Sequence, residues 1–388
     1  MLREYFGCTS IVPELVVIQC KRLFWANGAS ILGPMHSSMK VLCLLASALT
    51  FVLIAPAQPA KLSWQMQDSG TTAGLRGVDS VDGKVAWASG TEGTVLRTID
   101  GGEHWTKCAV SDAASDGATL DFRGVQAWDA QTAIVMSSGT GDKSRLYKTI
   151  DSCKTSTLLY TNPDKDGFWD SVRVDDKMTF MILGDPVDGQ FSVFNTNDGG
   201  KSWSKTQYPG LRSETGEGAF AASNSSLLVN WADGIAAFGT GGPSGARLFW
   251  NCDPCKRDAL WTAAPLMSFP KGASAGVFSL NLRDWHRWAA VGGDYKKPNE
   301  TSGTAAYSKD GGKTWTASTK PPHGFRSAVQ WSRDLKAWIA AGTNGSDVSY
   351  DDGKTWTPIE DGNWNALSLP FVVGPKGRIA KLSIMPGK

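Results

Sequence analysis

The fold is decided by the stretch Ser308–Trp315, which reads SKDGGKTW. The same rule, Ser/Thr-x-Asp-x-Gly-x-x-Trp, is met at residues 98–105, 196–203 and 349–356, and each copy follows a short apolar run. Repetition within one chain is typical of proteins built from stacked structural units, such as solenoids and propellers. We therefore expect a repeat protein. The repeated aspartate and tryptophan positions are Asp100, Trp105, Asp198, Trp203, Asp310, Trp315, Asp351 and Trp356.

The first copy closes a unit of four expected strands. Short apolar runs at residues 75–78, 85–88 and 94–98 precede a fourth strand that begins at the end of the motif. Four strands joined by tight turns in about 45 residues have the size of one propeller blade. Further units start at residues 122, 169, 219, 277 and 327, and those that start at 122 and 219 carry eroded copies of the motif.

The last unit is completed from both ends of the chain. Residues 364–382 supply three expected strands, and Leu62–Met66 resembles the Trp-bearing fourth strand of the other units. Closing the ring in this way removes two sheet edges that would otherwise be open to aggregation. We expect an all-β fold: a seven-bladed β-propeller of four-stranded antiparallel blades, closed by the N-terminal strand and forming a single domain over residues 58–388.

The segment 39–57 has the pattern of a secretory signal peptide. It begins with Met39-Lys40, continues with an apolar core over residues 41–55 and ends in small residues around Ala57. The core is shorter than the about 20 residues of a spanning helix, although a single membrane anchor is the alternative. We interpret residues 1–38 as a non-native upstream extension. The expected protein is exported, to the periplasm or the extracellular space, and its mature chain has no transmembrane segment.

Charge excludes one class of partner. Residues 1–57 hold four Lys/Arg and two Asp/Glu, so the remaining chain carries 35 charges of each sign. A neutral chain has no basic surface excess of the kind that attracts nucleic acid. We therefore expect no nucleic-acid partner, and we expect a monomer.

The repeated motif itself is expected to be structural. An aspartate in a turn accepts hydrogen bonds from main-chain N–H groups, and the glycine two residues later adopts positive φ. The tryptophan would then pack against the neighbouring blade. A calcium loop of the EF-hand type needs a glutamate twelve positions along, and counting from Asp351 reaches Gly362. We expect neither a metal nor another cofactor.

The motif is identified as the Asp-box, or BNR repeat, of sialidase-like and sortilin-like propellers. The stretch DGKVAWASGTEGTVLRTIDGGEHW, at residues 82–105, resembles more narrowly the photosystem II stability/assembly factor family of seven-bladed propellers. The resemblance covers about residues 62–388. It implies an exported, non-enzymatic propeller that binds a protein and helps to assemble a membrane complex.

Charged residues on the expected inner strands are the candidate binding groups. Arg76, Arg123 and Arg326 fall at similar places on first strands, which line the central channel of a propeller. Guanidinium groups there can bind the carboxylate of an acidic protein segment, or they pair with neighbouring Asp and Glu side chains. Asp170 and Glu217 are carboxylates on equivalent strands.

A carbohydrate-active hydrolase on the same fold is the alternative function. Sialidase-like relatives carry an Arg-Ile-Pro motif, whereas the nearest stretch here, residues 325–328, reads FRSA. Xyloglucanase-like relatives use a pair of aspartates and usually two propellers. Asp170 and Glu217 could form a carboxylate pair only at a suitable separation. We assign no catalytic residue.

The cysteines suggest disulfides rather than a metal site. Cys252 and Cys255 stand where the unit that starts at 219 lost its motif, and we expect a local disulfide between them. A Cys-x-x-Cys without a second pair or a nearby histidine is a poor zinc site. Cys108 with Cys153 is a second candidate pair between adjacent blades.

Two further patterns carry no function. Gly272–Gly276 matches the nucleophile-elbow pattern Gly-x-Ser-x-Gly, but that pattern requires a following helix and a strand is expected there. His104, His286 and His323 are scattered over different units and form no metal cluster visible in the sequence.

Overall fold

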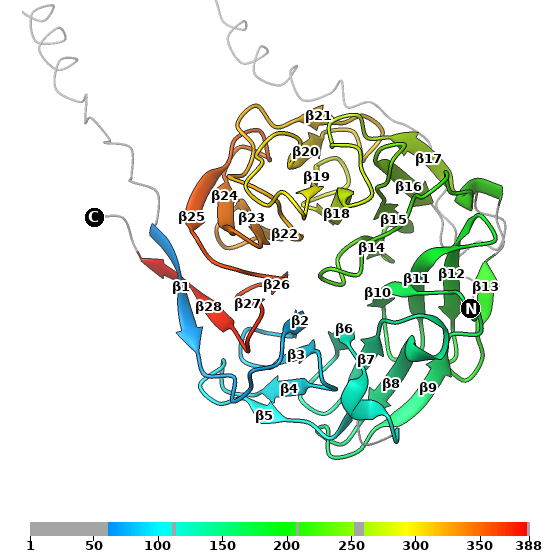
Figure 1. Ribbon diagram of the computed structural model, residues 1–388. Coiled ribbons are helices and arrows are strands. Elements are labelled where there is room, and N and C mark those ends of the chain that lie inside the picture. The colour runs from blue at the N-terminus through cyan, green and yellow to red at the C-terminus, as the bar shows by residue number, and fades with distance from the viewer. Residues whose placement is uncertain (1–60, 111–113, 207–208, 252–259, 386–388) are drawn as a thin grey trace, which may run out of the picture. The chain divides into compact units, whose positions relative to one another are not determined.

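The computed structural model describes residues 61–110, 114–206, 209–251 and 260–385. These residues form seven four-stranded antiparallel sheets arranged in a ring (Figure 1). The expected all-β, seven-bladed propeller is therefore confirmed. The proposed upstream extension 1–38, the signal peptide 39–57 and the Cys252–Cys255 pair lie outside the described residues. Within the described ranges, no helix combines the length and the apolarity needed to cross a membrane.

Blades 1 to 3 are each made of consecutive strands that follow one another from the channel outward. Blade 1 contains β2 (Leu75–Ser80), β3 (Ala86–Gly90), β4 (Val95–Thr98) and β5 (Thr106–Lys107). Blade 2 contains β6 (Phe122–Ala127), β7 (Ala133–Ser137), β8 (Arg145–Thr149) and β9 (Thr157–Thr161). Blade 3 contains β10 (Trp169–Val174), β11 (Phe180–Val187), β12 (Gln190–Thr196) and β13 (Ser204–Thr206).

Blades 4 to 6 follow the same order. Blade 4 contains β14 (Leu227–Asn230), β15 (Ile235–Gly239), β16 (Arg247–Asn251) and β17 (Thr262–Pro265). Blade 5 contains β18 (Ala275–Leu282), β19 (Trp288–Asp294), β20 (Ala305–Ser308) and β21 (Thr316–Ala317). Blade 6 contains β22 (Ala328–Ser332), β23 (Ala337–Gly342), β24 (Gly345–Ser349) and β25 (Thr357–Glu360). Short 3-10 helices are η2 (Gly117–Thr119), η3 (Gly141–Lys143) and η4 (Pro209–Leu211).

Blade 7 joins the two ends of the described chain. Its inner strands are β26 (Ala366–Ser368), β27 (Phe371–Val373) and β28 (Ile379–Met385), and its outer strand is β1 (Lys61–Gln67). β1 pairs with β28 along its whole length, from Lys61 opposite Met385 to Gln67 opposite Ile379, and Figure 1 shows the blue strand beside the red one. Ring closure by the N-terminal strand is therefore confirmed.

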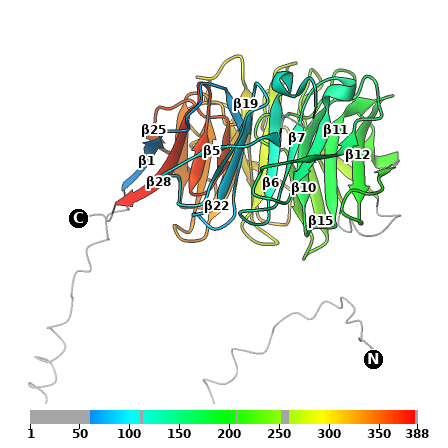
Figure 2. The ribbon, with the colours of Figure 1, turned by 90° about the horizontal axis from the view of Figure 1, so that it is seen from below.

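The blades stand side by side around the ring, and Figure 2 shows their strands from the edge of the disc. Neighbouring sheets pack face to face through apolar side chains. The cluster between blades 1 and 2, for example, contains Trp87 and Val95 of blade 1 with Phe122 and Tyr147 of blade 2. Because neighbouring sheets cover each other's faces, a binding site is expected at the edges of the inner strands and in the loops at either end of the channel.

The Asp-box turns connect the third and fourth strands and are held by one hydrogen-bond pattern. In blade 5, the Ser308 hydroxyl donates to Asp310 Oδ1 at 2.8 Å and accepts from the Gly312 N–H at 2.9 Å. The Thr314 N–H donates to the same aspartate oxygen at 2.9 Å. Gly312 has a φ of +81°, a conformation that glycine adopts without strain. Asp100, Asp198 and Asp351 make equivalent bonds in blades 1, 3 and 6.

The box tryptophans of blades 1, 3 and 6 pack against the preceding blade. Trp105 meets Phe371 of blade 7 edge-on at 5.7 Å, and Trp203 stacks on Tyr160 of blade 2 at 4.6 Å. The Trp356 indole N–H lies 3.3 Å from the Ser318 hydroxyl, which follows β21 of blade 5. Tryptophans close the corresponding interfaces of blades 4, 5 and 7, namely Trp261, Trp315 and Trp64.

Blade 2 closes its interface with blade 1 differently. Ser156 occupies the tryptophan position, and Cys153 in the same turn forms a disulfide with Cys108, just after β5 of blade 1. The expected second cysteine pair is therefore present. The box hydrogen bonds persist: Thr149 Oγ1 donates to Asp151 Oδ1 at 3.1 Å and accepts from the Cys153 N–H at 3.1 Å. The erosion seen in the sequence thus removes the tryptophan but keeps the turn.

We expect Asp151, in the eroded box of blade 2, to make the stability of the folded protein depend on pH in the acidic range. The hydroxyl and the N–H of Thr155 lower the pKa of Asp151 to about 2. Because this folded-state pKa lies below the unfolded value of about 3.9, the contribution is complete above the unfolded value and is lost as the pH falls toward about 2. Asp151→Asn removes this titration. Urea-unfolding midpoints at several acidic pH values should converge for wild type and variant as pH falls, and two parallel curves would contradict the prediction.

Candidate functional site

A pocket of about 590 Å³ lies at the end of the channel where the inner strands begin. All seven blades contribute to its wall. A second cavity of about 780 Å³ extends from it over blades 3 and 4, sharing Phe168, Asp185, Ala219, Phe220 and Ala273. We call the first cavity the channel pocket. Residues used below that line it are Arg76, Arg123, Asp170, Asp185, Phe220, Phe278, Tyr295 and Phe325.

A β-bulge near the start of four inner strands places the side chains that line this pocket. The pairing register shifts at 75/77 in β2, 122/124 in β6, 169/171 in β10 and 277/279 in β18. A bulge leaves one residue outside the ladder and redirects its side chain. The residues left out are Arg76, Arg123, Asp170 and Phe278, and all four line the channel pocket.

The glycine after each bulged arginine allows another part of the propeller to approach closely. A Cβ atom at Gly77 would lie 2.6 Å from Ser89 Oγ and 2.9 Å from the Arg123 carbonyl oxygen. A Cβ atom at Gly124 would lie 2.9 Å from Asn224 Oδ1. Arg-Gly marks the bulge in β2 and β6, whereas the bulges of β10 and β18 have a serine in place of the glycine.

The floor of the pocket is the segment 219–226, which precedes β14 and points toward the centre of the ring in Figure 1. Asn224, only 4% exposed, accepts the Val172 N–H at 2.8 Å and donates to the Val172 carbonyl at 3.2 Å. The Ser223 hydroxyl donates to the Ser327 carbonyl at 2.7 Å. The segment thereby connects blade 4 with blades 3 and 6 across the channel.

Two arginines share one carboxylate on one side of the pocket. Arg123 Nε donates to Asp121 Oδ2 at 2.8 Å, and Arg76 Nη2 lies 3.7 Å from the same oxygen. Burial, followed by the charge of Arg123, lowers the pKa of Arg76. Because one carboxylate faces two guanidinium groups, this side keeps an excess positive charge that can receive an anion.

The opposite side of the pocket is aromatic. Phe220 of the floor segment stacks on Phe278 with ring centroids 3.7 Å apart, and Phe325 meets Phe278 edge-on at 4.7 Å. Tyr295 lies 6.2 Å from Phe278. The pocket therefore combines a cationic and an apolar wall, as small-ligand and peptide sites commonly do.

Asp170 has a buried carboxyl oxygen that its surroundings leave unsatisfied, and Arg76 of the same pocket has a buried Nε in the same state. The Asp170 side chain is 1% exposed, and its Oδ2 has no hydrogen-bond partner among the described residues. Burial, and then the charge of Asp185, raise the pKa of Asp170 well above its usual range, although Arg123 opposes the shift. Burial also raises the pKa of Asp185 to about 6, against the bond that its carboxylate accepts from the Ala219 N–H.

The other two predicted residues lie elsewhere. Glu217 borders the neighbouring cavity, where its carboxylate accepts from Arg247 Nε at 2.9 Å and from the Thr240 hydroxyl at 2.5 Å. Arg326 is fully buried and pairs with Asp347 outside the channel pocket. The structure therefore brings Arg76, Arg123 and Asp170 together.

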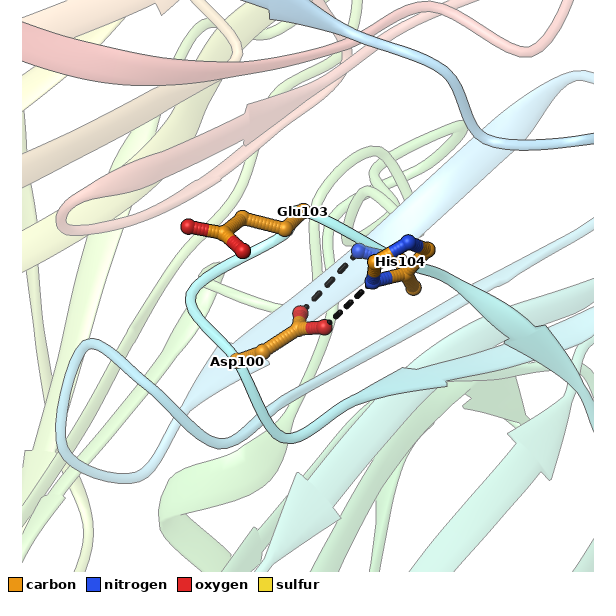
Figure 3. A group of neighbouring side chains, drawn as sticks. All are labelled: Asp100, Glu103 and His104. Atoms are coloured by element: carbon orange, nitrogen blue, oxygen red, sulfur yellow. Dashed lines mark hydrogen bonds and ion pairs between the residues drawn. The ribbon is translucent and has the colours of Figure 1, made fainter.

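The group Asp100, Glu103 and His104 lies in the box turn of blade 1 (Figure 3). His104 Nδ1 lies 2.7 Å from Asp100 Oδ2, and this contact is the main cause that raises the pKa of His104. In blade 3 the Ser202 hydroxyl donates to the corresponding oxygen of Asp198 at 2.6 Å. His104 thus takes the place of a turn-stabilising hydroxyl, at the end of the blade away from the channel pocket.

Comparisons with known proteins agree with this architecture. Residues 306–317 match the BNR/Asp-box repeat family model. No curated protein sequence matches the chain. A solved structure of YCF48 bound to D1 peptide has a TM-score of 0.57 and 16% identity, covering 83% of this chain and 96% of that one.

Two more solved structures share the fold. YCF48 from Cyanidioschyzon merolae has a TM-score of 0.59 at 17% identity, covering 84% of this chain and 100% of that one. The WD40 β-propeller domain of Doa1 has a TM-score of 0.54 at 12% identity, covering 83% and 97%. At these identities the likeness concerns the fold.

Proposed function

We propose that this protein is an exported, non-enzymatic propeller that binds a segment of a partner protein in the channel pocket and so assists the assembly of a membrane or envelope complex. One observation carries the proposal: Arg76 and Arg123 share the single carboxylate of Asp121 and face an aromatic wall. The YCF48 structure with a D1 peptide supports it by example, because that propeller of similar fold holds a peptide.

The chemistry of the pocket favours an acidic peptide segment with a neighbouring apolar side chain. A guanidinium group forms two parallel hydrogen bonds with a carboxylate, which gives direction as well as affinity. Phe220, Phe278 and Phe325 would contact the apolar side chain. The volume of about 590 Å³ lies within the range of ligand pockets.

Export through the segment 39–57 belongs to the same proposal. The Cys108–Cys153 disulfide supports it, because structural disulfides persist in oxidising compartments. Sequencing the N-terminus of the native protein tests it: a mature chain that starts near residue 58 is expected, and one that starts at residue 1 would contradict it.

Arg76→Gln combined with Arg123→Gln is expected to weaken peptide binding by about 100-fold. The reason is that both guanidinium groups that would pair with the carboxylate of the bound peptide are removed. Arg333→Gln, at an exposed position on blade 6, is the matched control and should bind as wild type does. The measurement is fluorescence anisotropy with labelled segments of membrane proteins encoded by the same genome, first selected on a peptide array.

Two results would contradict the proposed function. One is binding that the arginine changes leave unaltered. The other is turnover of a sialoside or a β-glucan by the purified protein that is lost in an Asp170→Asn variant. The second result would favour the carbohydrate-active hydrolase.

A further inference from the structure

We propose that the Asp170 carboxyl group, in its protonated form, donates a hydrogen bond to a main-chain carbonyl of the bound peptide, next to the Arg76 and Arg123 pair that receives the peptide's carboxylate. This inference rests on the proposed function and adds a proton-dependent specificity residue to it. Asp170 would make the peptide's affinity depend on pH.

The geometry places the Asp170 carboxyl group at the pocket and leaves it unsatisfied. The β10 bulge at 169/171 removes Asp170 from the strand ladder, and the side chain lines the channel pocket. Its Oδ2 is buried and has no partner among the described residues. A buried polar atom without a partner is uncommon in native structures. A ligand in the pocket can supply the missing partner.

The neighbouring charges favour the neutral form. Asp185 on β11 and Asp121 before β6 place negative charge at the pocket, whereas Arg76 on β2 and Arg123 on β6 are already shared by Asp121. Tyr295, after β19, is the remaining titratable group of the described pocket wall. The adjoining cavity adds Glu217, which is paired with Arg247. Burial and the charge of Asp185 raise the pKa of Asp170 more strongly than Arg123 lowers it.

Protonation decides what the pocket can accept. A neutral carboxyl group has one O–H donor, whereas a carboxylate is an acceptor only. An ionised Asp170 would repel a peptide carboxylate and would compete for Arg123. Arg123 therefore remains fully available to the ligand only while Asp170 holds its proton.

Two labelled probes separate the possible sources of the carboxylate. The first is dansyl-GGFGDG-amide, whose only carboxylate is a side chain. The second is dansyl-GGFGG, whose only carboxylate is the chain terminus. Both carry a phenylalanine for the aromatic wall. The probe that binds more tightly identifies the source.

The pH profile of wild-type binding is the first measurement. Because the peptide binds with its own carboxylate ionised and with Asp170 protonated, affinity should be constant above the pKa of the peptide carboxylate and fall as pH rises through the raised pKa of Asp170. We expect a fall of about tenfold, the equivalent of one lost hydrogen bond, as Asp170 ionises at a pH well above the usual aspartate range.

Three variants assign the effect. Asp170→Asn keeps a donor that cannot ionise, so its affinity should stay near the wild-type value at low pH and be independent of pH. Asp170→Leu has no donor and should bind about tenfold more weakly at low pH, again without pH dependence. Asp185→Asn is the comparison variant: it should keep the fall with pH but shift it to lower pH, because the charge of Asp185 contributes to the raised pKa of Asp170. Thermal unfolding of each variant checks that it is folded.

The outcomes distinguish this inference from the proposed function. Binding that is independent of pH in wild type, or a pH dependence that survives in Asp170→Asn and disappears in Asp185→Asn, overturns the role of Asp170 alone. If neither probe binds wild type at any pH, the pocket is not a peptide site and both proposals fail.

Discussion

Asp347→Ala is expected to lower the free energy of unfolding by about 3–5 kcal/mol, because it leaves a buried guanidinium group without its counter-charge. Arg326 and Asp347 have fully buried side chains and face each other beneath the start of blade 6. Arg326 Nε donates to Asp347 Oδ2 at 2.6 Å, and His323 Nδ1 lies 2.8 Å from Asp347 Oδ1. Urea unfolding, extrapolated to water, measures the loss.

A double change tests the cause. Replacing both partners by apolar residues, Arg326→Met with Asp347→Leu, removes the unpaired charge and should recover most of the lost stability. Asp334→Ala, at an exposed position on the same blade, serves as the surface control. Equal destabilisation by the single and the double change would show that packing rather than charge explains the effect.

Removal of the Cys108–Cys153 disulfide is expected to lower the free energy of unfolding by about 4 kcal/mol in the chain-entropy description. The cysteines are 45 residues apart, so the bond restricts a long loop in the unfolded chain. It also closes the blade 1–blade 2 interface, where Ser156 stands in place of a tryptophan. The comparison is urea unfolding of wild type and of Cys108→Ser with Cys153→Ser.

Introducing the tryptophan that the other blades have at this position is expected to compensate in part for the loss of the disulfide. In the Cys108→Ser background, Cys153→Gly with Ser156→Trp rebuilds a complete box, and we expect it to restore part of the stability. Thiol titration of the denatured, unreduced mature protein should find fewer than four free thiols. Four free thiols, or unfolding that reduction leaves unchanged, would contradict the prediction.

The fold could be predicted because its determinants are local and repeated. The box bonds use a Ser or Thr hydroxyl, an aspartate and main-chain N–H groups, so even the copy around Asp151 forms the turn without its glycine and tryptophan. The outer strand β1 could be placed because Trp64 repeats the tryptophan of the other fourth strands.

The site could be predicted only in part. Arg76 and Arg123 precede glycines and lie at bulges, whereas Arg326 precedes β22, whose described pairing shows no shift. The partner of Arg326 is Asp347, which lies two strands further along the chain. No sequence pattern indicates that these two residues form a pair. Asp185 carries no signal in the sequence, because it reads as part of an ordinary second strand and its raised pKa arises from burial.

The pairing of β1 with β28 has a consequence for the order of events during synthesis. β1 is made at the start of the described chain, and its hydrogen-bonding partner is made at the end. Blade 7 therefore cannot form while the chain is still growing. Blades 1 to 6 each consist of four strands that are consecutive in the sequence, so they can form as they are synthesised. Until the last strand is complete, β1 and the edge of β27 are exposed, and this is the interval in which a chaperone would protect the chain.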